Sequence, residues 1–141
     1  MSPDMSPASM RIAGVLFVLV PTIAFGGASL LWMIRSRLPG YLDNPLRQAL
    51  FRAGHAHAGV LVMLALVGLL YVDGAALAPA AKRLVRSSLA FAPILVSAGF
   101  FLSVASPRAT RPGKLIGLVY LGFALLTVGT VTLGVGMLRA G

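Results

Sequence analysis

Four long apolar stretches dominate the sequence, and a stretch of this kind strongly restricts how a chain can fold. Residues 12–34 contain no charged side chain. At about 1.5 Å per helical residue, they are long enough to cross a hydrocarbon core of about 30 Å. Only 11% of the 141 residues are charged, against about 25% in an ordinary soluble domain. The chain lacks the polar surface that a globule in water requires, so we predict that it folds in a bilayer.

The remaining apolar stretches complete an all-α membrane protein, which we predict to be an antiparallel bundle of four transmembrane helices. The predicted spans are 12–34, 45–72, 87–105 and 115–138. Before the second span, Asp43 or Asn44 is placed to cap a helix, and Pro45 fits its first turn. Residues 1–10 are rich in Ser, Pro and Met. We expect a disordered tail there, followed by a single domain over residues 11–141.

The first apolar stretch also admits a second interpretation. Arg11, the apolar residues after it, and the small residues Gly27 and Ala28 together resemble a cleavable signal peptide. The apolar region of a signal peptide is about 7–15 residues long, whereas this stretch continues to Ile34. Its length favours a helix that is retained in the mature protein.

The positive charge of the chain lies mainly between its apolar stretches. Twelve Lys and Arg residues outnumber three acids, which gives a net charge of +9. The sequence contains no nucleic-acid-binding module, so we expect no nucleic acid partner. We interpret the basic residues as determinants of topology and as contacts to the anionic headgroups of the lipid bilayer.

The distribution of these basic residues predicts how the chain is oriented in a cell membrane. With four spans, the first and third connections share a side, where seven basic residues stand against five on the other side. The seven are Arg35, Arg37, Arg47, Arg52, Arg108, Arg111 and Lys114. The five are Arg11, Lys82, Arg83, Arg86 and Arg139. By the positive-inside rule, we expect a multi-pass protein with both termini outside the cytoplasm.

Both histidines of the chain, His55 and His57, lie in the second span. Two positions correspond to about 200° around a helix, so a regular helix cannot present both rings to one metal ion. Joint coordination requires a local unwinding, which Gly54 and Gly59 would permit. His55 shares its face of the helix with Arg52, whereas His57 points deeper into apolar surroundings.

We therefore interpret His57 as the first candidate ligand for a haem iron or a metal ion. His55 is the second candidate for the same role, and Arg52 is placed to pair with haem propionates. If neither histidine binds a cofactor, we expect both at the membrane interface, hydrogen-bonded to headgroups, water or carbonyl groups.

The segment GHAHAGVLVML (residues 54–64) resembles the histidine-bearing helix of haem–copper oxidase subunit I and its relatives. In that family, a histidine followed by a small residue and an apolar run is an axial haem ligand, so the resemblance implies this role for His57. The family has further histidines on other helices, which this chain lacks, so an oxygen-reducing copper–haem centre is not expected. A six-coordinate haem would take its second ligand from a symmetry-related subunit, Met63 or Met33.

Other functions remain open beside haem binding. The acids Asp4, Asp43 and Asp73 lie outside the spans or at their ends, whereas a proton-coupled transporter usually carries an acid inside the membrane. A small oligomeric channel or transporter that uses the histidines as a polar relay stays open, as does an accessory subunit without a cofactor. Every alternative predicts a homo-oligomer or a subunit of a membrane complex. Since no catalytic triad, paired carboxylates or phosphate-binding loop is present, we do not expect an enzyme.

Overall fold

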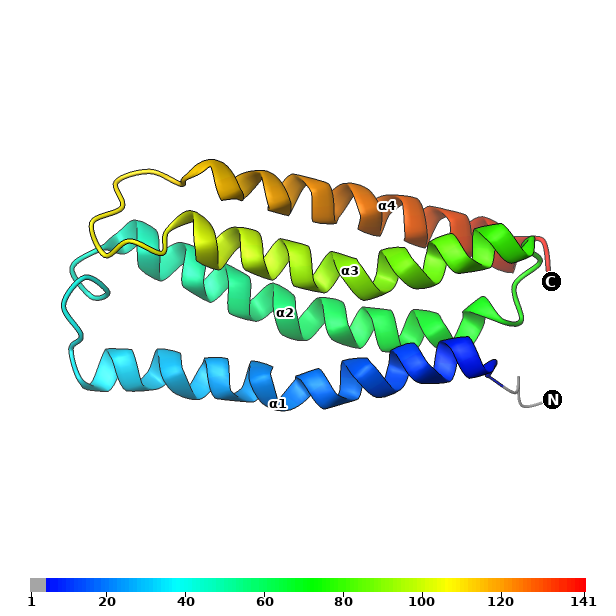
Figure 1. The fold of residues 1–141 in the computed structure, drawn as a ribbon, viewed down its shortest axis with the longest axis horizontal. Helices are drawn as coiled ribbons and strands as arrows, with labels where there is room; N and C mark the ends of the chain where they lie inside the picture. Colours follow the sequence, from blue (N-terminus) through cyan, green and yellow to red (C-terminus); the bar gives the residue numbers. More distant parts are fainter. Residues whose placement is uncertain (1–4) are drawn as a thin grey trace.

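The computed structural model describes residues 5–141 and contains four long helices (Figure 1). They are α1 (Pro7–Arg35), α2 (Pro45–Val72), α3 (Pro79–Ser103) and α4 (Gly117–Leu138), with a short 3-10 helix, η1 (Lys114–Ile116), before α4. The helices run antiparallel, so the start of α1 and the end of α4 lie at the same end of the molecule. All four are long and apolar enough to cross a membrane. The predicted all-α, four-helix fold is confirmed.

Proline and a capping side chain explain where the helices begin. α1, α2 and α3 each start with a proline, which is favourable because the first N–H of a helix has no partner within the helix. At α2, the Asn44 side chain accepts a hydrogen bond from the N–H of Arg47 at 3.0 Å. The predicted cap and both predicted ends of the second helix are therefore confirmed.

The start of α1 corrects the prediction of a disordered tail over residues 1–10. Residues 1–4 lie outside the described residues, but α1 begins at Pro7. The Ser6 hydroxyl caps this helix by accepting the N–H of Ser9 at 3.3 Å, and Ser9 is fully buried. Ser6 and Pro7 therefore form a helix cap and the start of the first turn.

The third helix also starts earlier than predicted. We expected a span over 87–105, whereas α3 begins at Pro79 and ends at Ser103. Lys82, Arg83 and Arg86 consequently lie on the helix and not in the connection before it. Apolar length marks the part of a helix that could cross hydrocarbon. Ala, Lys, Arg and Leu are all good helix formers, so the helix itself begins earlier.

Glycines bring α3 and α4 into close contact. A Cβ atom at Gly122 would lie 2.6 Å from Val96 Cγ2 and 3.0 Å from the Val96 backbone nitrogen. A Cβ atom at Gly99 would lie 2.7 Å from the backbone nitrogen of Val119. Small residues at such positions let helix backbones approach closely, which is how helices associate in lipid.

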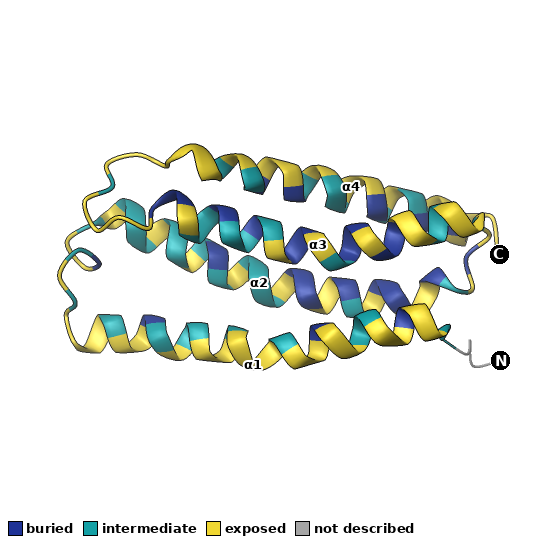
Figure 2. Ribbon diagram, viewed as in Figure 1, coloured by how far each residue is buried: buried dark blue, intermediate teal, exposed yellow. Residues whose placement is uncertain are grey.

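The helices form an open arrangement in which each packs mainly on its neighbour in the chain. The most buried apolar side chains belong to α2 and α3, including Leu69, Val72 and Val85. On α1 only Ser9, Leu16 and Leu30 are buried, and Figure 2 shows mostly exposed residues along this helix. Within residues 5–141, α1 and α4 make no contact with each other. The two outer helices thus present broad apolar faces to the bilayer.

Candidate functional site

His57 is held by contacts to three helices. On α2 itself, His57 Nδ1 lies 2.7 Å from the carbonyl oxygen of Ala53, one turn earlier. The ring also packs against Phe100 of α3 and Phe123 of α4, with ring centroids 5.2 Å and 5.6 Å away. Because a carbonyl oxygen only accepts hydrogen bonds, Nδ1 carries the proton and the neutral ring has its lone pair on Nε2.

The Nε2 atom of His57 is the free coordinating atom of this site. Among residues 5–141 it has no hydrogen-bond partner, and it is not one of the fully buried polar atoms. His57 lies about 7 Å further along α2 than Arg52, which places it below the headgroups when Arg52 lies at their level. The structure thus presents a lone pair at the surface of the bundle, within the apolar helix α2.

His55 faces a different helix. A Cβ atom at Gly27 of α1 would lie 3.0 Å from His55 Nε2, and one at Gly26 would lie 3.5 Å from His55 Nδ1. His55 therefore packs against the α1 backbone and is half-buried there. α2 is uninterrupted from Pro45 to Val72, so the unwinding needed for joint coordination with His57 is not present.

The other residues proposed for the haem do not gather around His57. Arg52 is exposed, and it lies about 140° from His57 but about 60° from His55 around the helix. Met63 is 68% exposed and lies about 120° from His57 on the same helix, so it cannot reach the opposite side of an iron bound there. Met33 lies near the end of α1 and is half-buried.

The available side chains fit one ligand position of a haem better than they fit a metal ion held by this chain alone. Within residues 5–141, no group of three or more His, Cys, Asp and Glu side chains is placed to hold a metal ion. One imidazole with an oriented ring fits a single axial position of a haem.

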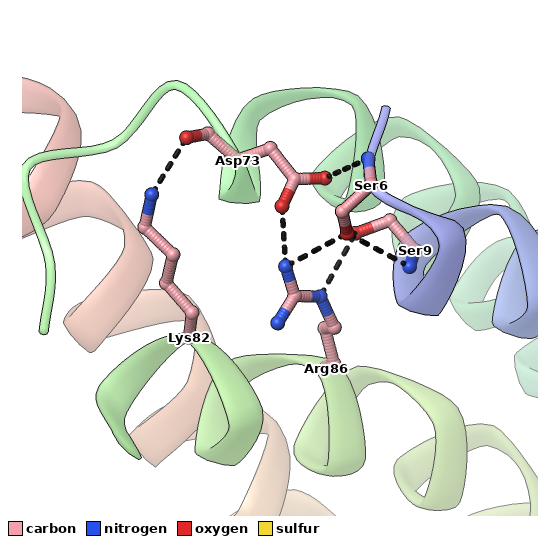
Figure 3. A network of polar contacts seen from close by, with 5 residues as sticks. All are labelled: Ser6, Ser9, Asp73, Lys82 and Arg86. Atoms are coloured by element: carbon pink, nitrogen blue, oxygen red, sulfur yellow. Dashed lines mark hydrogen bonds and ion pairs between the residues drawn. The ribbon is translucent and has the colours of Figure 1, made fainter. Parts of the chain in front are cut away.

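A polar network at the opposite end of the molecule escaped the sequence analysis (Figure 3). Arg86 of α3 forms an ion pair with Asp73, which follows α2. Arg86 Nε also donates to the Ser9 hydroxyl at 2.8 Å, and Arg86 Nη2 donates to the Ser6 hydroxyl at 3.1 Å. The Ser6 N–H donates to Asp73 Oδ2 at 3.0 Å, and Lys82 Nζ donates to the Asp73 carbonyl oxygen at 2.6 Å. The network joins α1, α2 and α3.

Burial and hydrogen bonding act in opposite directions on the Asp73 carboxyl. Burial raises its pKa, but hydrogen bonds from Ser9 and from the amide and hydroxyl of Ser6, together with the charge of Arg86, lower the pKa by more. The result is a fall from the usual 3.8 to about 2. A sequence signal for this pair existed, because an acid at the end of one helix and a base near the start of the next meet across a tight hairpin.

A second set of hydrogen bonds fixes the connections at the other end. Arg47 donates through Nε to the carbonyl oxygen of Val104 at 3.0 Å, through Nη1 to that of Gly40 at 2.9 Å, and through Nη2 to that of Ala105 at 3.1 Å. Asn44 Nδ2 donates to the carbonyl oxygens of two residues in the third connection. Arg47 thus satisfies carbonyl groups that the end of α3 leaves without helical partners.

Comparisons with known proteins do not assign the chain to a family. No protein-family model, curated protein or solved structure matches it. The haem–copper oxidase resemblance therefore rests on residues 54–64 alone. The fold carries the general conclusion: four apolar helices fit a small integral membrane protein with several spans.

Proposed function

We propose that this protein binds haem in the membrane, with His57 Nε2 as one axial ligand to the iron. The observation that supports the proposal is the Nδ1 hydrogen bond to Ala53, which orients the ring and leaves Nε2 as an unpartnered acceptor. A polar atom without a partner is costly in hydrocarbon, by several kcal/mol in order of magnitude. Coordination would remove that cost.

The residues around His57 have defined roles in this proposal. The Ala53 carbonyl fixes the tautomer and makes the imidazole a better donor. Phe100 and Phe123 pack against the ring and hold its plane. A haem bound there would supply one-electron redox chemistry or a site for a small gas ligand.

The second axial ligand points to an assembly. Met63 and His55 lie on other faces of α2 than His57, and Met33 lies near the end of α1. We therefore propose that a second copy of this chain or another membrane subunit supplies it. Arg52, on the His55 side of α2, is a candidate for propionate contact only if the haem extends around the helix.

The visible absorption spectrum tests the proposal. Protein expressed with haem precursor supplied is expected to show a Soret band that His57→Ala removes. His55→Ala is the matched control, because it alters the same helix two positions away and should keep the band. Folding of both variants is checked by circular dichroism and by elution volume in detergent. Haem binding at His57 is ruled out if the wild-type protein lacks a Soret band, or if His57→Ala retains it.

A haem-free result would favour an accessory subunit. The open arrangement of helices supports that alternative, because α1 and α4 leave broad apolar faces and make no contact with each other within residues 5–141. Co-purification from native membranes under mild detergent would then identify the larger assembly to which the chain belongs.

We also propose that both termini lie outside the cytoplasm of the cell. The support is the distribution of exposed cations. At the end formed by the first and third connections, five exposed cations lie on or beside the connections: Arg35, Arg37, Arg108, Arg111 and Lys114. At the opposite end, Arg86 is buried in the ion pair with Asp73. The positive-inside rule then assigns the first and third connections to the cytoplasm.

A further inference from the structure

We propose that the end of the molecule formed by the first and third connections binds the phosphate groups of anionic phospholipids. We call this surface the cationic end. It consists of Arg35, Arg37, Arg108, Arg111 and Lys114, all of which are exposed. The inference concerns a different part of the molecule from His57 and does not depend on haem binding.

The charge of the cationic end is not neutralised by the protein. The only ion pair within residues 5–141 is the one between Arg86 and Asp73, at the opposite end. Asp43 is the one acid in the two connections, and its carboxylate accepts the N–H of Gly40 at 2.6 Å within its own loop. A surface with five cations and one such acid is complementary to phosphate.

Hydrogen bonds make this surface rigid. Asn44 Nδ2 donates to the carbonyl oxygens of Pro107 at 3.1 Å and Ala109 at 3.0 Å, on both sides of Arg108. Gly40 packs so closely on Pro107 that a Cβ atom would lie 2.5 Å from the Pro107 Cβ. The cations are therefore presented on loops that are already ordered, which lowers the entropic cost of binding.

The backbone of Arg37 and the position of Trp32 support the same conclusion. Arg37 is the only non-glycine residue with positive φ, at 49°, among residues 5–141, and its N–H donates to the Ile34 carbonyl oxygen at 3.2 Å. This conformation ends α1 and fixes where the Arg37 side chain leaves the backbone. Trp32 is 59% exposed one turn before Arg35, at the level where tryptophan anchors a helix among headgroups.

The opposite end provides an internal contrast. There Arg86 is committed to Asp73 and Lys82 donates to the Asp73 carbonyl oxygen. The exposed cations that remain are Arg11, Arg83 and Arg139. The exposed cations thus number five at the cationic end and three at the opposite end. This difference is proportionally larger than the seven to five that the sequence alone gives. Anionic lipids are concentrated in the cytoplasmic leaflet, which agrees with the proposed orientation.

The single tryptophan makes the proposal testable by energy transfer. Trp32 is the only Trp in the chain, and it lies beside the cationic end. The full chain is reconstituted in phosphatidylcholine vesicles that contain a trace of dansyl-phosphatidylglycerol or dansyl-phosphatidylcholine. We expect stronger transfer from Trp32 to the anionic probe than to the zwitterionic one, and a decrease of that preference as salt is added.

Two triple Gln variants, one at each end of the molecule, test whether the lipid preference comes from the cationic end or from the total charge of the protein. Arg37→Gln, Arg108→Gln and Arg111→Gln together remove cations from the cationic end. This variant is expected to lower the relative affinity for the anionic probe by about a hundredfold, since each of the three surface cations contributes about fivefold. The corresponding Lys substitutions are expected to retain the preference.

The matched control carries Arg11→Gln, Arg83→Gln and Arg139→Gln, and it should keep the preference. All six positions are exposed, so both variants are expected to fold, which circular dichroism checks. Equal losses in the two triple variants would overturn the proposal, as would no loss in either. Inorganic phosphate that abolishes the preference at the same ionic strength as a chloride control would also overturn it, because the site would then take free phosphate.

Discussion

The guanidinium of Arg86 and the carboxylate of Asp73 form an ion pair that joins the first turns of α3 to the end of α2. The pair is shielded, because the two side chains are only 11% and 15% exposed. The hydroxyls of Ser6 and Ser9 complete it from α1. The network thus combines groups from α1, α2 and α3 and their caps, which makes it a joint between three helices.

Loss of one partner of this joint is expected to destabilise the protein. Arg86→Met should lower the free energy of unfolding by about 3 kcal/mol, because it removes the only charged partner, within residues 5–141, of a largely shielded carboxylate. Unfolding in mixed micelles with increasing dodecyl sulfate measures the change. Arg83→Met is the control, since Arg83 is exposed and should change stability by less than about 0.5 kcal/mol. Equal effects of the two substitutions would contradict a role for the ion pair.

The stability of the protein should fall in acid through Asp73. Its pKa is lowered from 3.8 to about 2 in the folded protein, so the ionised form is favoured by folding. This contribution is fully present above pH 3.8 and is lost as the pH falls towards 2. Asp73→Asn should show less change in unfolding midpoint across that window than the wild-type protein. A parallel pH dependence in both proteins would show that another group is responsible.

Glycine positions on α4 should differ sharply in their tolerance of a methyl group. Gly122→Ala places a Cβ against both the side chain and backbone of Val96 and is expected to cost about 1–3 kcal/mol by overpacking. Gly134→Ala is the control on the same helix, because nothing lies within 4 Å of its added Cβ. The control should be neutral or slightly stabilising, since Ala is a better helix former than Gly. Thermal unfolding in detergent compares the two variants.

The orientation of the chain can be read with single cysteines, because the protein has none of its own. Gly141→Cys marks the C-terminal end, and Thr110→Cys marks the third connection. In intact cells, a membrane-impermeant maleimide is expected to label Gly141→Cys at once and Thr110→Cys only after lysis. The reverse pattern would place the cationic end outside the cytoplasm.

The sequence predicted features that depend on local periodicity and capping. The bounds of α2 agree with the structure because Asn44 and Pro45 mark its start and Asp73 and Gly74 follow its end. The start of α3 was missed because the hydropathy of a span records where lipid contacts a helix, and not where its hydrogen bonds begin. The same error hid Arg86, which seemed to lie in a loop.

The candidate site was likewise predictable from the sequence only in part. Helical geometry alone separated His55 from His57, and the structure places them against different helices. Helical geometry could not predict which helix each ring faces, because that depends on how α1 and α3 pack around α2. It also could not predict the Nδ1 hydrogen bond to Ala53, which depends on the rotamer of His57.

The open arrangement of helices has a consequence for how the molecule is assembled. Most contacts between helices join neighbours in the chain, so each helix can pack on the preceding one as it enters the membrane during synthesis. The network at Arg86 is an exception, since its hydrogen bonds to Ser6 and Ser9 span 80 and 77 positions of sequence. The N-terminal end of α1 is therefore fixed in place only after α3 has been synthesised and Arg86 can bind Ser6 and Ser9.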